Sequence, residues 1–178
     1  MWGIKVFSST NPLSGALLMG AILSQAAQAG ETEAVVRIPG ATIQLTSPVA
    51  SSNPASDVQS LAIFYISTNP RTGFGANINL QRQTFTGELS AFRAVSLAQF
   101  KTLGMTVLED KTVGNGADAI LHMEYIGSMQ GRSFHWLAHA VKVDGSILLA
   151  TCTTDTDGWT DLEPLCRTGL DSMRVKRD

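Results

Sequence analysis

The chain has few charged residues, few aromatic residues and no apolar segment long enough to span a membrane. Charged residues are 16% of its 178 positions, aromatic residues are 7%, and the formal net charge is −2. A basic patch that would attract nucleic acid or an anionic membrane surface is therefore not expected. The length is that of one domain, with enough chain to bury a hydrophobic core.

Motifs of catalysis are also missing. The sequence contains no Gly-x-Ser-x-Gly motif and no glycine-rich loop ahead of a predicted helix. Gly73-Phe74-Gly75 opens a predicted strand, so its glycines serve a turn, and neither cysteine has a neighbouring base. We therefore expect that the protein is not an enzyme and that it needs no cofactor.

Residues 1–29 have the pattern of a secretory signal peptide. Lys5 precedes an apolar run at residues 13–23, and Ala27-Gln28-Ala29 has the small-x-small form of a cleavage site. The alternative is a membrane anchor, but the run is shorter than the roughly 20 apolar residues of a membrane-spanning helix. No cysteine follows the cleavage site, which argues against a lipoprotein. We expect an exported protein, periplasmic or secreted, that consists of residues 30–178 and has no membrane span.

Residues 116–154 predict three β-strands joined by two tight connections. Asp144-Gly145 is a strong signal for a two-residue hairpin turn, and a turn centred there pairs Leu137 with Cys152. The first of the three strands returns through the loop 127–131, and its register is inferred by matching apolar residues across that loop. In this register one face of the sheet is nearly all apolar, whereas the other face mixes apolar and polar side chains.

Two amphipathic segments predict helices that cover these two faces. Residues 88–103 place their apolar side chains on one side and would cover the apolar face; these side chains are Leu89, Phe92, Val95, Phe100 and Leu103. Thr160 and Glu163 could form a capping box for a second helix that ends near Met173 and covers the mixed face. The fold class is therefore α+β, an α/β/α sandwich with a central antiparallel sheet and a helix on each face.

The segments outside the three-strand unit and the helices predict further short strands and one loop. Residues 47–59 are rich in Ser, Pro, Ala and Asn and predict a loop. Short strands are predicted at residues 35–39, 42–45, 61–66, 74–83 and 105–109.

The chain has two cysteines, Cys152 and Cys166. In an oxidising compartment we expect them to form a disulfide, which would join the second helix to the sheet. Closing a loop of this length stabilises a fold by about 3 kcal/mol in the chain-entropy model. The alternative is a pair of buried free thiols.

The mixed face also carries candidate metal ligands. The inferred register pairs His122 with His135, and Glu124 follows on the same face, so these three side chains could hold zinc or copper. His139 is roughly 13 Å along the strand from His135, too far to join them. The alternative is a polar patch beside a helix end.

A second acidic group lies after the last predicted strand. It resembles a calcium loop, but turn and helix N-terminal carboxylates explain it equally well. Its members are Asp155, Asp157, Asp161 and Glu163.

Three segments, in this order, carry a resemblance to a known fold. They are the strand Gly73-Phe74-Gly75-Ala76-Asn77-Ile78-Asn79, the helix end at residues 97–104, and Thr151-Cys152-Thr153 before the last helix. Their order resembles the PsbP-like fold and, within it, the small bacterial DcrB-like envelope proteins, over residues 41–174. The Pro-x-Gly-Trp-type strand start of such proteins is absent at Thr46-Ser47-Pro48-Val49. The resemblance implies an α/β/α sandwich, a role in binding, and no shared catalytic residues.

Together these features predict an exported, non-enzymatic protein-binding module of the bacterial envelope, either an accessory factor or a neutraliser of a secreted protein. Its expected partner is another protein and not nucleic acid. The alternative is a small-ligand or metal-binding periplasmic protein that uses the mixed face.

Overall fold

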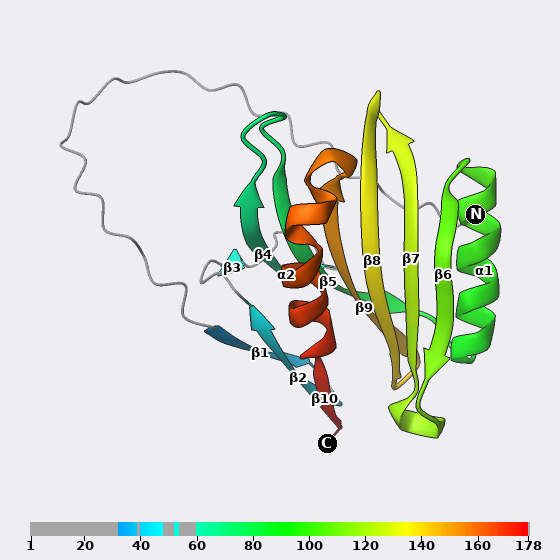
Figure 1. Cartoon of the computed structure of the whole chain (residues 1–178). Coiled ribbons are helices and arrows are strands. Elements are labelled where there is room, and N and C mark those ends of the chain that lie inside the picture. The colour runs from blue at the N-terminus through cyan, green and yellow to red at the C-terminus, as the bar shows by residue number, and fades with distance from the viewer. Residues whose placement is uncertain (1–31, 39, 48–51, 54–59, 178) are drawn as a thin grey trace.

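The computed structural model describes residues 32–38, 40–47, 52–53 and 60–177, which fold into two antiparallel sheets and two α-helices (Figure 1). The predicted signal peptide, residues 1–29, lies outside the described residues, as does most of the predicted loop 47–59. Among the described residues, no helix is both long and apolar enough to cross a membrane. The mixed α+β class predicted from the sequence is confirmed.

The larger sheet has seven strands in the order β3-β4-β5-β9-β8-β7-β6. Alternation of apolar and polar residues explains its inner strands, as in β5, where Ala76, Ile78 and Leu80 are buried and the residues between them are partly exposed. The predicted unit of three strands forms β7, β8 and β9. The seven strands are β3 (Ser52–Asn53), β4 (Ser60–Thr68), β5 (Gly75–Thr84), β6 (Thr106–Val113), β7 (Ile120–Met129), β8 (Arg132–Val143) and β9 (Ser146–Asp155).

The smaller sheet has three strands in the order β1-β2-β10, namely β1 (Thr32–Ile38), β2 (Ala41–Ser47) and β10 (Arg174–Arg177). The sequence predicted β1 and β2 but not β10, which pairs with β2 after the chain has crossed the whole domain. Ile43 and Leu45 of β2 are almost fully buried in the core. The smaller sheet is therefore a packed layer of the fold and not an edge of the central sheet.

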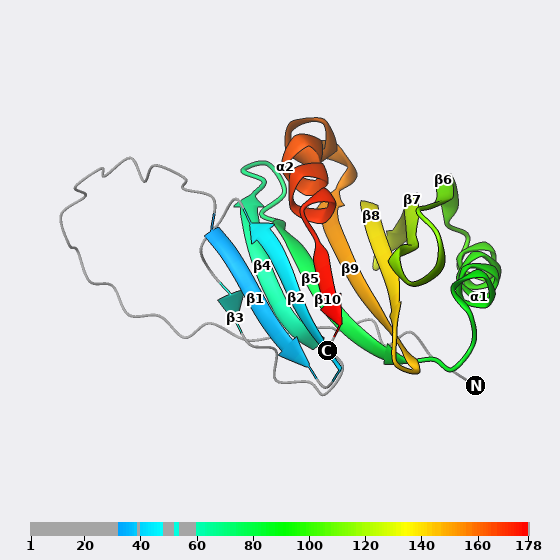
Figure 2. The ribbon, with the colours of Figure 1, turned by 90° about the horizontal axis from the view of Figure 1, so that it is seen from below.

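Hydrophobic side chains form two clusters, one on each face of the larger sheet, because successive residues of a strand point to opposite sides. On one face, Phe92 and Phe100 of α1 (Leu89–Thr102) pack with Trp136 of β8. On the other face, Leu170 of α2 (Trp159–Asp171) packs with residues of β8, β9 and the smaller sheet. Figure 2 shows α1 beside β6 and α2 above β5 and β9. The second face is thus covered by a helix and a sheet together, and not by a single helix.

Two details of the predicted helices are wrong. Val95 and Leu103, expected on the buried side of α1, are 46% and 53% exposed, because the buried stripe is narrow and Leu103 already caps the helix. The expected capping box of α2 is also absent. The Asp155 side chain instead accepts a hydrogen bond from the backbone N–H of Gly158, just before α2 begins.

The register of the two hairpins decides which side chains meet on the mixed face. The turn at Asp144-Gly145 pairs β8 with β9 as predicted, with Leu137 opposite Cys152. Between β7 and β8 the predicted loop is wrong. A two-residue turn at Gln130-Gly131, with positive φ angles of 53° and 76°, pairs His122 with His139 instead of His135. Because His135 and His139 are an even number of residues apart, every side chain stays on its predicted face.

The Cys152–Cys166 disulfide predicted from the sequence is present, and it joins β9 to α2. Both cysteines are fully buried. The bond fixes α2 over the mixed face of the sheet, where the histidines lie.

Candidate functional site

All three histidines of the chain lie on the mixed face of β7 and β8, and all are buried: His122 is 7% exposed, and His135 and His139 are each 5% exposed. Buried polar side chains are stable only where they have partners, so the contacts of each ring define the site. A cavity of about 250 Å³ adjoins His122 and His139, and Arg167 and Asp171 of α2 line its other side.

His122 and His139 are cross-strand neighbours that share one hydrogen bond. Nδ1 of His122 lies 2.9 Å from Nε2 of His139, so one of these nitrogens carries the shared proton. Burial, together with the neighbouring His122, lowers the pKa of His139 to about 4. Burial also lowers the pKa of His122, although the charge of Glu109 opposes this shift. Both rings are therefore neutral near neutral pH, and each has one nitrogen without a proton.

Glu109 reaches the site because of a β-bulge in the edge strand β6. The register shifts between Val107 and Glu109, so Leu108 occupies the extra position and Glu109 lies opposite Glu124 of β7. In the regular alternation Leu108 would have faced Glu124. The Glu109 carboxylate has one oxygen 3.0 Å from Nε2 of His122 and the other 2.6 Å from Nζ of Lys111. The hydrogen bond from Lys111 lowers the pKa of Glu109, which is ionised.

Glu124 joins the histidines to α2. One of its oxygens lies 2.8 Å from Nε2 of His135, and the other accepts a hydrogen bond of 2.9 Å from Nη2 of Arg167. Arg167 also donates to Glu163 at 2.7 Å. The His135 ring stacks on Trp159 at the start of α2, with centroids 3.6 Å apart and planes inclined by 10°. The contacts of Glu124 are thus shared between the sheet and the helix.

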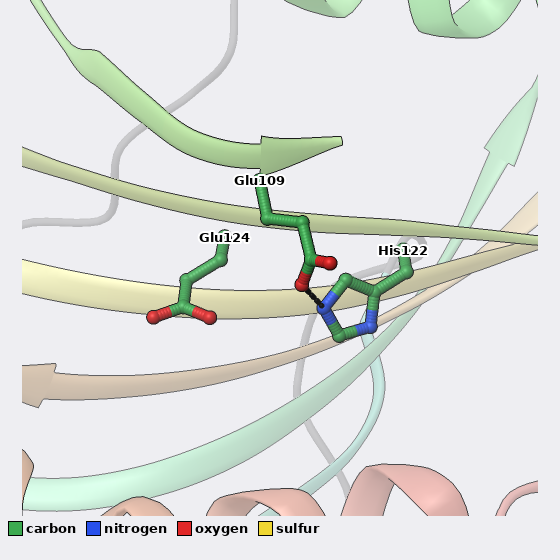
Figure 3. A group of neighbouring side chains, drawn as sticks. All are labelled: Glu109, His122 and Glu124. Carbon is green, nitrogen blue, oxygen red and sulfur yellow. Dashed lines mark ion pairs between the residues drawn. The ribbon is translucent and has the colours of Figure 1, made fainter. Parts of the chain in front are cut away.

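The structure brings together two of the three predicted metal ligands and adds a third that the sequence did not reveal. One possible ligand atom from each of Glu109, His122 and Glu124 lies within 4.8 Å of the others (Figure 3). His135 contacts Glu124 but is not a member of this group. His139, which the inferred register placed too far away, is in direct contact with His122. Glu109 was missed because the bulge interrupts the alternation that would have placed it.

Two members of the second acidic group serve the local structure around α2. Asp155 is buried and accepts hydrogen bonds from the side chains of Asn69 and Thr72 and from the backbone of Gly158. Glu163 is paired with Arg167. These contacts account for both carboxylates without a bound ion.

Comparisons with solved structures identify proteins with a similar fold. No protein-family model matches the chain, and no curated protein matches it. Among solved structures, the cyanobacterial PsbP of Synechocystis sp. PCC 6803 is similar with a TM-score of 0.58 and 14% identity, over 88% of this chain and 98% of that chain. LpqN of Mycobacterium tuberculosis, which is involved in cell envelope biogenesis, has a TM-score of 0.53 and 16% identity, over 82% and 91%.

A third similar structure is protein PA94 of Pseudomonas aeruginosa, with a TM-score of 0.54 and 18% identity, over 74% of this chain and 89% of that chain. The fold of this chain is therefore PsbP-like, as the sequence resemblance implied. At these identities the likeness concerns the fold alone.

Proposed function

We propose that the chain is an exported, non-enzymatic binding protein of the cell envelope that docks an extended segment of another protein along β6. Three features support export to the envelope: the signal-peptide pattern of residues 1–29, the Cys152–Cys166 disulfide, and a fold shared with a protein of cell envelope biogenesis. Disulfides persist in oxidising compartments outside the cytosol.

The observation that carries the docking proposal is the exposed edge of the larger sheet. Strand β6 ends the sheet and pairs only with β7 among the described residues, so the outer side of its backbone has no strand partner. Helix α1 nevertheless lies beside this strand (Figure 2) and is joined to it by the Arg93–Asp110 ion pair. The three most exposed large hydrophobic side chains of the described residues lie in or next to β6: Val113 at 55%, Leu103 at 53% and Leu108 at 51%. An open strand edge with exposed apolar side chains is the surface that β-strand addition uses.

The contacts of the potentially reactive side chains support a binding role over catalysis. Both cysteines are joined in the disulfide. His122 and His139 contact each other, and His135 contacts Glu124. Nucleophilic catalysis needs a nucleophile next to a base, and these imidazoles are engaged with other imidazoles or with carboxylates.

Capture of the protein with a C-terminal tag from native envelope extract, with mass spectrometry of bound proteins, tests the proposal. We expect one dominant partner at near-equal stoichiometry. Leu108→Lys places a charge on the open edge and should abolish capture. Tyr65→Lys is the matched control, because Tyr65 is 45% exposed on β4, near the other end of the strand order.

Equal capture by the wild-type protein and Leu108→Lys would contradict docking on β6. A preparation with no bound partner would contradict the protein-binding function itself. Loss of the partner from Leu108→Lys alone supports both.

A further inference from the structure

We propose that Glu109, His122 and Glu124 form a binding site for one divalent transition-metal ion, such as Zn²⁺. The site is on the α2 side of the sheet, where β6 and β7 pair. It is independent of the docking proposed above, which uses the open edge of β6.

The first observation is a buried nitrogen that lacks a hydrogen bond. His122 is 7% exposed, and its Nε2 atom has no hydrogen-bond partner among the described residues. The nearest carboxylate oxygen, from Glu109, lies 3.0 Å away, but it is not aligned to accept an N–H bond from the ring. A metal ion bound by this nitrogen would lie on the axis of its lone pair. A second ligand of the same ion lies to one side of that axis, because two ligands of one metal are at an angle to each other, and the Glu109 oxygen is in such a position.

The second observation is the chemistry and spacing of the donors. Zn²⁺ binds imidazole nitrogen at about 2.0–2.1 Å and carboxylate oxygen at about 2.0–2.2 Å, which separates ligand atoms in a tetrahedral site by roughly 3.4 Å. The pair from His122 and Glu109 is at 3.0 Å, and one oxygen of Glu124 is within 4.8 Å of both. Binding of one ion by all three side chains would bring Glu124 closer to this pair.

The hydrogen bond between His122 and His139 positions the ligand ring. A metal-binding histidine commonly donates its other N–H to a neighbouring acceptor, which fixes the tautomer. Donation from Nδ1 of His122 to Nε2 of His139, 2.9 Å away, leaves Nε2 of His122 free for an ion. His139 therefore acts as a positioning residue, and His135 does the same for Glu124.

The charges around the site favour a cation. Three carboxylates and two basic side chains lie around the neutral histidine pair: Glu109, Glu124 and Asp171 against Lys111 and Arg167. Both oxygens of Glu124 already have partners, His135 on one and Arg167 on the other, so Arg167 and a bound metal compete for this carboxylate. Three protein ligands leave a fourth tetrahedral position for water.

The test is calorimetric titration of Zn²⁺ into the chelator-stripped full protein, purified with a tag that contains no histidine. The chain has only three histidines, all in this region, so competing imidazole sites are absent. We expect one ion per chain with a micromolar or lower dissociation constant. Glu109→Gln should weaken binding by at least about tenfold. Its matched control is Glu88→Gln, because Glu88 is, like Glu109, a glutamate paired with a lysine, in this case Lys142.

A variant that binds Zn²⁺ more tightly than the wild-type protein would distinguish a metal site from a cluster of side chains that only stabilises the fold. Arg167→Met removes the competitor of the ion, and we expect it to tighten Zn²⁺ binding by about tenfold, the effect of one charge at a few ångströms in a partly screened site. Circular dichroism in the presence of chelator checks that each variant is folded. No Zn²⁺ uptake by the wild-type protein, equal affinity in Glu109→Gln, or weaker binding in a folded Arg167→Met would each overturn the proposal.

Discussion

Acidification should destabilise the metal-free protein chiefly through His139. This ring is 5% exposed, and burial together with the contact to His122 lowers its pKa to about 4. In the unfolded chain the same group has a pKa of about 6.5. Between about pH 6.5 and about pH 4, His139 is protonated in the unfolded chain but remains neutral in the folded chain. The stability contribution is therefore complete above about pH 6.5 and is lost progressively as the pH falls toward about 4.

The two pKa values give the magnitude. Between about pH 7 and about pH 5, a group with pKa values near 6.5 unfolded and near 4 folded removes about 2 kcal/mol from the free energy of unfolding. The pKa of His122 is lowered in the same direction, so its titration adds to the effect.

Urea unfolding at several pH values, in the presence of a chelator, measures this loss. The comparison is between the wild-type protein and His139→Gln, which keeps a polar side chain at the position but removes its titration. We expect the loss of unfolding free energy between about pH 7 and about pH 5 to be about 2 kcal/mol smaller in the variant. Identical pH dependence in the two proteins would refute the reasoning, because other titrating groups contribute equally to both.

Three further predictions concern the packing that holds the site in place. Replacing Cys152 and Cys166 together with Ala should lower the free energy of unfolding by about 3 kcal/mol in urea titration, because the disulfide spans a sequence separation of 14; no change would mean that the bond does not form. Gly169→Ala should cost about 1–3 kcal/mol, because its Cβ atom would lie 2.5 Å from Cδ1 of Ile78. Ile78→Val in the same chain should recover part of that cost, and an additive loss would contradict the contact. Asp155→Ala should lower the free energy of unfolding by about 2 kcal/mol, because it leaves the donors that now bond to the buried carboxylate without an acceptor. An unchanged melting temperature would contradict this role.

The sequence predicted the parts of the fold that depend on local signals. Asp-Gly at residues 144–145 adopts the positive φ angles of a hairpin turn readily, and the register of β8 with β9 followed from it. The turn between β7 and β8 has Gln130 at positive φ, a conformation that glutamine rarely adopts. Its position could not be inferred from turn residues, and the matching of apolar side chains gave a register in which His139 was excluded from the site.

Two other features depend on contacts between distant parts of the chain. Strand β10 is a short segment in which three of the four residues are basic, and it becomes a strand because β2 offers it a partner. Glu109 lies in the site because of the β-bulge in β6. The extra residue of a bulge cannot be recognised from the pattern of polar and apolar residues, so the sequence did not predict this position. The Cys152–Cys166 disulfide was predictable because the chain has one cysteine pair.

The most direct test of the proposed function is photo-crosslinking in the living cell, with a photoreactive amino acid at position 108 on β6 or at position 65 on β4. Both side chains are about half exposed, at 51% for Leu108 and 45% for Tyr65, so the two positions differ mainly in location. Docking on the open edge of β6 predicts one discrete crosslinked partner from position 108 and none from position 65. Crosslinking from position 65 alone, or from neither position, would contradict the account.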